Sequence, residues 1–143
     1  MDPITAAIVA GAAAGLTSTV SRAVRDAYDG LKGLLSARFP RVDLAPVEEL
    51  PDSPSKQESL AEDLVRFGAD RDAEVLRLAE ALTVVIAREA PQAAARVGVD
   101  LERVKGQFLE IRRVQGGVRV RDAETSGGIT ITDVQAGGGS DPN

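Results

Sequence analysis

The chain has 143 residues, of which 43 % are hydrophobic and 3 % aromatic, and its formal net charge at pH 7 is −5. It contains no cysteine and no histidine, which excludes disulfides, zinc sites of the usual ligand types and catalysis by a cysteine nucleophile or a histidine base. The length predicts one domain with a tail. An aliphatic, alanine-rich core suits close-packed helices better than a β-sandwich.

Charge is spread unevenly along the sequence. Residues 1–41 hold five basic and three acidic groups. Residues 42–90 hold five basic and twelve acidic groups, and residues 91–143 hold seven basic and seven acidic groups. No segment is basic enough to favour nucleic-acid binding. The first basic residues follow an uncharged stretch, an order that suits an anionic membrane surface, although a solvated helix face is the alternative. The candidates for contact with lipid head groups are Arg22, Arg25 and Lys32.

The uncharged stretch is Pro3–Ser21. As a continuous helix it would be about 28 Å long, close to a hydrocarbon core of about 30 Å. Three interpretations stay open: a permanent transmembrane helix, the core helix of a soluble bundle, and a helix that is packed in one state and inserts into a membrane in another. The N-terminal residues lack the basic charge of a signal peptide. The candidates for membrane insertion are Ile4, Ile8, Val9 and Leu16.

Small residues recur every four positions in this stretch, at Ala7, Gly11 and Gly15. On a helix they form one smooth face, and this spacing allows two helix backbones to approach closely. We therefore expect a helix–helix zipper at these three residues.

Four helices are predicted between the N-terminus and Arg113. The first begins near Ile4 and continues to Phe39, with a bend or break at Gly30 and Gly33 because glycine is unfavourable inside helices. Residues 40–54 hold four of the seven prolines and predict an irregular connection. Ser55 and Glu58 fit a capping box that starts the second helix, which ends at Gly68.

The third helix is predicted to begin at a cap of Asp70 or Asp72 and to end at Glu89. Residues 91–97 suggest one or two helical turns that Gly98 ends, and Asp100 then caps the fourth helix. Apolar residues at helical spacing predict the core faces of these two helices: Val75, Leu78, Ala79, Leu82, Val85 and Ile86 in the third, and Leu101, Val104, Phe108 and Ile111 in the fourth.

Beyond Gly116 the pattern becomes alternating. Two eleven-residue segments align without gaps, GGVRVRDAETS and GGITITDVQAG, each with a Gly-Gly turn and a short β-branched strand. They could form a hairpin, a partly disordered tail, or two rungs of a β-solenoid that recruits the same segment from another chain. The candidate templating residues are Gly117, Val118, Val120, Asp122, Gly128, Ile129, Ile131, Asp133 and Val134.

We therefore expect a mainly α protein, with a four-helix bundle over residues 1–113, a short β-repeat over residues 114–137 and a flexible terminus over residues 138–143. Three segments together resemble the bacterial Bell domain with a C-terminal amyloid signalling motif, a family similar to the fungal HeLo domain and to the executioner bundle of mixed-lineage kinase-like proteins. They are MDPITAAIVAGAAAG, SPSKQESLAEDLVRFGAD with LRLAEALTVVI, and GGVRVRDAETSGGITITDVQAGG.

The resemblance implies a membrane-targeting cell-death effector of a bacterial immune system. A nucleotide-binding receptor with a matching motif would template the tail, the bundles would assemble with one another, and the first helix would attack membrane lipid. The protein would be cytoplasmic before activation and at the inner face of the plasma membrane afterwards. The alternative is a non-lytic adaptor. No catalytic motif, cofactor or metal site is expected.

Overall fold

The computed structural model describes residues 1–17 and 19–123, and for residues 115–123 it describes the backbone. This part of the chain is mainly helical, as predicted, and contains no strand. Its compact unit Met1–Phe108 is followed by a second unit, Leu109–Asn143. The helices are α1 (Pro3–Gly15), α2 (Arg22–Arg38), α3 (Ala45–Glu49), α4 (Pro54–Arg66), α5 (Ala73–Glu89), α6 (Pro91–Arg96) and α7 (Leu101–Ala123), with a 3-10 turn η1 (Ala69–Arg71).

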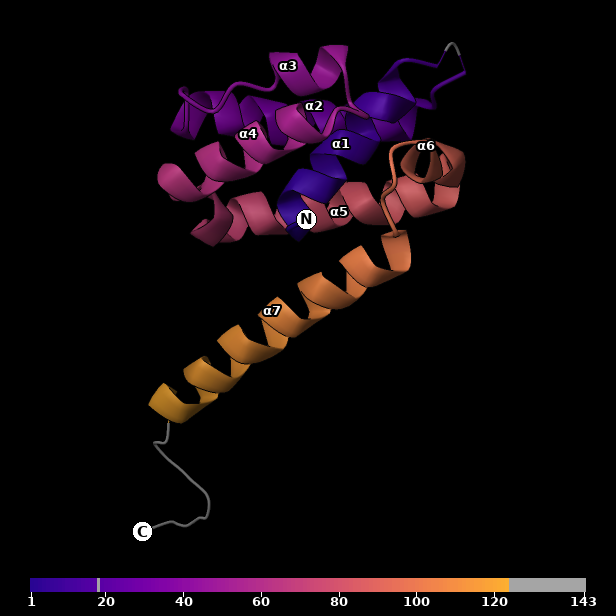
Figure 1. The fold of residues 1–143 in the computed structure, drawn as a ribbon. Coiled ribbons are helices and arrows are strands. Elements are labelled where there is room, and N and C mark those ends of the chain that lie inside the picture. Colours follow the sequence, from indigo (N-terminus) through magenta and orange to yellow (C-terminus); the bar gives the residue numbers. More distant parts are fainter. Residues whose placement is uncertain (18, 124–143) are drawn as a thin grey trace, which may run out of the picture. The chain divides into compact units, whose positions relative to one another are not determined.

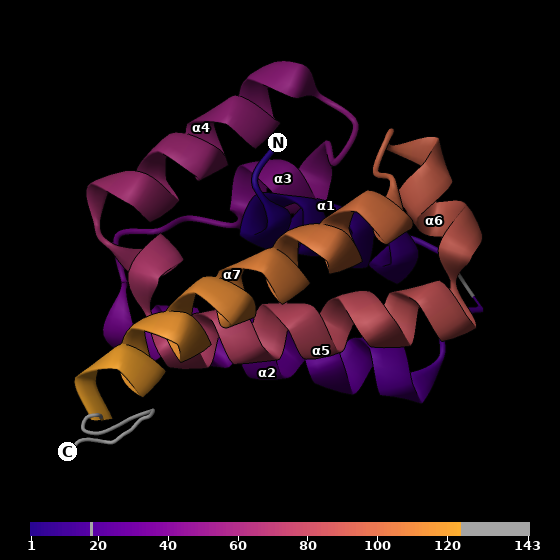
Figure 2. The same cartoon turned by 90° about the horizontal axis from the view of Figure 1, so that it is seen from below.

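The centre of the first unit is α1, which contacts α2, α3, α4, α5 and α6. Both views place α1 between the surrounding helices (Figures 1 and 2). Every residue from Ile4 to Ala14 is buried, because a helix that is apolar on all sides must be enclosed on all sides. This burial fits two of the three interpretations, a core helix and a helix that is packed in one state and inserts in another.

The predicted first helix is wrong in its length, because the chain breaks between α1 and α2. The N–H groups of Leu16 and Thr17 donate hydrogen bonds to the carbonyl oxygens of Ala13 and Ala14, three residues back instead of four. Ser21 then caps α2 by accepting a hydrogen bond from the Val24 N–H at 3.2 Å. Serine and threonine side chains near such a break compete for backbone groups that would continue a helix. By contrast, α2 continues through Gly30 and Gly33, where we expected a bend.

The bundle therefore does not have the expected four helices. Besides the break after α1, short helices α3 and α6 occupy two connections, one in the proline-rich segment and one where helical turns were predicted. The side chain that caps α4 is Ser53, which accepts from the Lys56 N–H at 3.4 Å, and not Ser55. Pro54 explains this shift, because the first helical position needs no N–H donor.

The glycine stops and acidic caps are confirmed. Gly68 and Gly98 have φ angles of +81° and +75°, which suit glycine after a helix. Asp100 accepts from the N–H groups of Glu102 and Arg103 at the start of α7. Val104 and Phe108 are buried in the first unit, as the predicted stripe requires.

The buried face of α5 lies slightly differently from the prediction. Val75, Ala79, Leu82 and Ile86 are buried as expected, but Leu76 and Thr83 complete the face, while Leu78 and Val85 are half-buried. The Thr83 hydroxyl donates to the Ala79 carbonyl at 2.9 Å. This bond within one turn satisfies a polar group that would otherwise be costly to bury.

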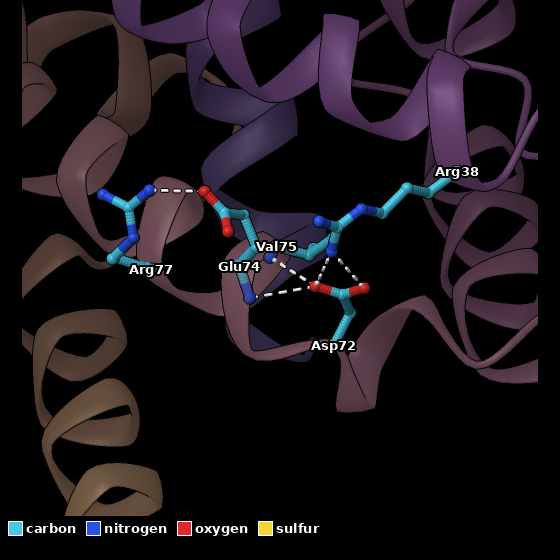
Figure 3. A network of polar contacts seen from close by, with 5 residues as sticks. All are labelled: Arg38, Asp72, Glu74, Val75 and Arg77. Carbon is cyan, nitrogen blue, oxygen red and sulfur yellow. Dashed lines mark hydrogen bonds and ion pairs between the residues drawn. The ribbon is translucent and has the colours of Figure 1, made fainter.

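Asp72 joins the start of α5 to the end of α2 (Figure 3). Its carboxylate accepts from the N–H groups of Glu74 and Val75 at 2.9 and 3.1 Å and from Nη1 of Arg38 at 3.0 and 3.2 Å. Burial acts to raise the pKa of the Asp72 carboxyl, but the hydrogen bonds from Val75, Arg38 and Glu74 outweigh it and hold the pKa below its ordinary value.

The Asp72→Asn variant should be less stable than the wild type by about 0.5–1 kcal/mol at pH 7, because asparagine still caps the helix but loses the ion pair with Arg38. A depressed pKa contributes stability above the unfolded pKa of about 3.9, and this stability is lost as pH falls through the folded pKa. Urea unfolding of both proteins should therefore show their difference shrinking below about pH 4. A difference that stays constant down to pH values below both pKa values would contradict this role.

The helix α7 extends past the predicted boundary at Arg113 and includes residues 116–123, where we expected the first strand of the repeat. A strand needs a neighbouring strand for its backbone groups, whereas a helix bonds them within itself. The second repeat segment lies beyond residue 123, outside the described residues, so the pairing of the two segments stays a prediction.

Candidate functional site

The candidate site is α1 with the side chains that enclose it. Ile4, Ile8 and Val9, three of the residues predicted to enter a membrane, are at most 1 % exposed. Asp2 caps the helix by accepting from the Thr5 N–H at 3.0 Å, and it also accepts from the Thr5 hydroxyl. The fourth predicted residue, Leu16, is 65 % exposed at the other end. Hence the apolar side chains are enclosed along α1 and exposed only where the helix ends.

The predicted zipper residues lie in two different environments. Ala7 and Gly11 are buried, whereas Gly15 is exposed. A Cβ atom added at Gly11 would lie 2.6 Å from Cδ2 of Tyr28 and 3.3 Å from Cδ2 of Leu82, but one added at Gly15 would meet nothing within 4 Å. The close approach at Gly11 is therefore made within this chain, between α1 and the side chains of α2 and α5.

Tyr28 connects this approach to α3. Its hydroxyl donates to Oε2 of Glu48 at 2.8 Å, and Nζ of Lys32 donates to the same oxygen at 2.9 Å. Burial, followed by the hydrogen bond and the charge of Glu48, raises the pKa of the Tyr28 phenol far above its ordinary value. The phenol consequently stays protonated and remains a hydrogen-bond donor across the physiological pH range. Tyr28, Lys32 and Glu48 form a cluster that we call the Tyr28 clamp.

Tyr28→Phe should lower the free energy of unfolding by about 1 kcal/mol, because it removes the hydrogen bond to Glu48 but keeps the ring against Gly11. Tyr28→Ala should cost about 3–5 kcal/mol, because it also leaves a cavity beside α1. Urea unfolding measures both. Equal losses from the two variants would mean that the ring does not support α1.

The residues predicted to contact lipid head groups are partly neutralised. Arg22 lies 3.9 Å from Asp26, in a pair that is largely exposed, and Lys32 pairs with Glu48. Arg25 is exposed and forms no ion pair with any described residue. Of the three, Arg25 thus has its charge most readily available to an outside anion.

A second basic group was missed by the sequence analysis. The guanidinium carbons of Arg41 and Arg66 each lie 6.0 Å from the centre of the Phe67 ring, a geometry typical of cation–π contacts. Neither arginine pairs with a carboxylate among the described residues. Val65 beside them is 60 % exposed. The contact of Arg66 with Phe67 could be predicted from the sequence because the two residues are adjacent. The contact of Arg41 with the same ring depends on the fold.

The structure describes the backbone of only four of the nine predicted templating residues. Gly117, Val118, Val120 and Asp122 lie on the helical backbone at the end of α7. Gly128, Ile129, Ile131, Asp133 and Val134 lie outside the described residues. Their proposed role stays a prediction.

Within residues 1–17 and 19–123, no helix is both long and apolar enough to cross a membrane. The same part of the chain has no group of three or more acidic side chains placed to hold a metal ion.

Comparison with protein families identifies the chain. The model of the Het-E N-terminal domain matches residues 1–139. The chain belongs to the Het-E N-terminal domain family. This family is related to HeLo-like cell-death domains and is linked to cell death in heterokaryon incompatibility. No curated protein and no solved structure matches the chain significantly.

The sequence of this Het-E N-terminal domain indicates α1 as the central element but does not indicate the residues that hold it. Tyr28 is the only tyrosine in the chain, yet its partner Glu48 lies 20 positions away, and nothing in the local pattern connects them. The spacing of Ala7, Gly11 and Gly15 predicted a close approach of two helix backbones, whereas the close neighbour at Gly11 is an aromatic ring of the same chain, and association of helices through the three residues stays a prediction.

Proposed function

We propose that this Het-E N-terminal domain is a membrane-targeting cell-death effector in which α1 leaves the bundle and disrupts a lipid bilayer. The observation that carries the proposal is that α1 is uncharged and apolar on every face. Such a helix is stable in a protein core or in lipid, but not in water. Membership in a family related to HeLo-like cell-death domains supports the same function.

The packed state would keep α1 away from the membrane. The Tyr28 clamp closes over Gly11, and the Asp72–Arg38 pair connects α2 to α5, the two helices with which α1 makes many of its contacts. Loss of these contacts would expose the zipper face, and released helices could then associate through Ala7, Gly11 and Gly15. The basic residues Arg25, Arg41 and Arg66 would favour an anionic bilayer surface.

We further propose that the trigger is assembly of the C-terminal segment. A partner receptor with a matching motif would template residues 114–137, and the bundles would be concentrated at one place. Tethering of this kind raises apparent affinity by about 10²–10⁴ without new contacts. Activation would move the protein from the cytoplasm to the inner face of the plasma membrane, with membrane lipid and further copies of itself as its partners.

A non-lytic adaptor is the second candidate, and the length of α1 favours it. Thirteen helical residues span about 20 Å, well short of a hydrocarbon core of about 30 Å. In an adaptor α1 would stay in the core, and the C-terminal segment would join the chain to signalling assemblies. An effector must instead disrupt the bilayer without a full span, or extend the helix through Leu16–Ser21.

Dye leakage from anionic liposomes distinguishes these candidates. The protein is tested with and without preformed seeds of a peptide covering residues 112–140. We expect seed-dependent leakage from the wild type, and strongly reduced leakage from Gly15→Leu, which obstructs the zipper without a clash in the bundle. Gly30→Leu is the matched control, because Gly30 is also an exposed helical glycine with open space around it.

Leakage that is unchanged in Gly15→Leu would overturn the zipper. Seeds that grow on the full chain without any leakage from the wild type would favour the adaptor.

A further inference from the structure

A cavity of about 330 Å³ lies where the end of α1 meets α2 and α3. Gly11 and Gly15 line it from α1, Tyr28 from α2 and Glu48 from α3. Ligand pockets in proteins commonly measure about 300–1,000 Å³, so this one suits a small molecule. Gly15 is exposed, and apart from its chain neighbours and the nearby backbone of its own helix no atom lies within 4 Å of the position of a Gly15 Cβ, so there is free space at the end of α1.

Part of the cavity lining is apolar. This part comes from Ala12, Leu16, Val20 and Val24. Leu16 is largely exposed to solvent, whereas Val24 is buried. An aliphatic group placed between them would remove apolar surface from water, which is favourable at about 25 cal/mol per Å².

The lining also carries two charges of opposite sign that do not pair. Arg25 and Asp29 both line the cavity and lie four positions apart on α2, and neither forms an ion pair with a described residue. Arg22 and Asp26 have the same spacing on the same helix and do pair, at 3.9 Å. The third charged group, Glu48, is already held by Tyr28 and Lys32.

We infer that this cavity binds a small zwitterion with an aliphatic body, the chemistry of a free apolar α-amino acid. The ligand carboxylate binds Arg25, its ammonium group binds Asp29, and its side chain lies against Leu16, Val20 and Val24. A single charge would satisfy one of the two groups only, whereas a zwitterion complements both.

Such a ligand joins α2, through Val24, Arg25 and Asp29, to Leu16 and Val20 in the segment that follows α1, so its binding stabilises the packed position of the end of α1. Binding to the folded state alone raises stability in proportion to the logarithm of ligand concentration. This inference does not depend on membrane disruption, because it concerns only the packed bundle.

Thermal unfolding and titration calorimetry with L-leucine test the inference. The comparison ligands are 4-methylpentanoate, which lacks the ammonium group, 3-methylbutylamine, which lacks the carboxylate, and glycine, which lacks the side chain. We expect a saturable rise in melting temperature with leucine. Each analogue should bind at least about tenfold more weakly than leucine. Gly15→Leu should abolish leucine binding by filling the cavity, whereas Gly30→Leu should retain it.

Charge variants test the assignment of the two ends. Arg25→Gln should remove the advantage of leucine over the amine, and Asp29→Asn should remove its advantage over the acid. Absence of leucine binding to the wild type, equal binding of leucine and both analogues, or retained binding in Gly15→Leu would each overturn the inference. Melting of the variants without ligand shows that they are folded.

Discussion

Replacing Gly11 by leucine should lower the free energy of unfolding by about 3 kcal/mol, whereas the same change at Gly15 should leave it unchanged or raise it slightly. At Gly11 the first added carbon already lies 2.6 Å from the Tyr28 ring, and the hydrogen bond to Glu48 holds that ring in place. Overpacking of this kind costs about 1–3 kcal/mol and sometimes more. At Gly15 there is open space, and leucine favours a helix over glycine by somewhat under 1 kcal/mol.

Urea denaturation of both variants measures this difference. Tyr28→Ala combined with Gly11→Leu provides the control, because removing the ring should recover part of the loss if the clash is with Tyr28. Equal stabilities of the two glycine variants would mean that α1 and α2 are not in close contact at Gly11. The result also matters for function, because reduced leakage from Gly11→Leu alone could not separate a lost zipper from a damaged fold.

Deletion of residues 1–20 should abolish cooperative folding altogether. The deleted segment contains all of α1, and burial of Ile4, Ile8 and Val9 alone contributes about 5–9 kcal/mol. That is comparable with the whole stability of a typical domain, about 5–15 kcal/mol. The faces of the five helices that contact α1 would also be exposed.

Circular dichroism during thermal unfolding measures this effect. The full chain should unfold in one cooperative transition, and the truncated chain should show none. A truncated chain that still unfolds cooperatively would contradict the central place of α1. If the prediction holds, a truncated chain cannot show which element disrupts membranes, and point variants such as Gly15→Leu are needed.

The sequence predicted those features that depend on short-range chemistry. Gly68 and Gly98 mark helix ends because positive φ angles favour glycine, and Asp72 and Asp100 mark helix starts because their carboxylates reach N–H groups two and three residues ahead. The enclosure of α1 also follows from its composition, since a helix without a polar face has no side to turn to water.

Features that depend on the fold were missed. The break before α2 was indicated by Ser21, a good N-cap at the point where the sequence becomes amphipathic, but the hydrophobic period continues across it. The contact of Tyr28 with Gly11 and Glu48 joins three helices and has no local signature. The repeat beyond Gly116 was identified from its alternation, and the pairing of its two segments stays a prediction because the second segment lies outside the described residues.

The central claim is that α1 is enclosed in the bundle and leaves it on activation. Because the chain has no cysteine, one introduced thiol reports on one position. Val9→Cys places it at a fully buried site, and Leu16→Cys places it at an exposed one. The rate of thiol labelling is measured without liposomes, before and after addition of seeds of residues 112–140, so that a released α1 meets water and not lipid, and leakage is measured in parallel with anionic liposomes. We predict slow labelling at position 9 that accelerates strongly with seeds, and fast labelling at position 16 without them.

Labelling at position 9 that stays slow while seeds cause leakage would show that α1 remains in the core, and would contradict the account.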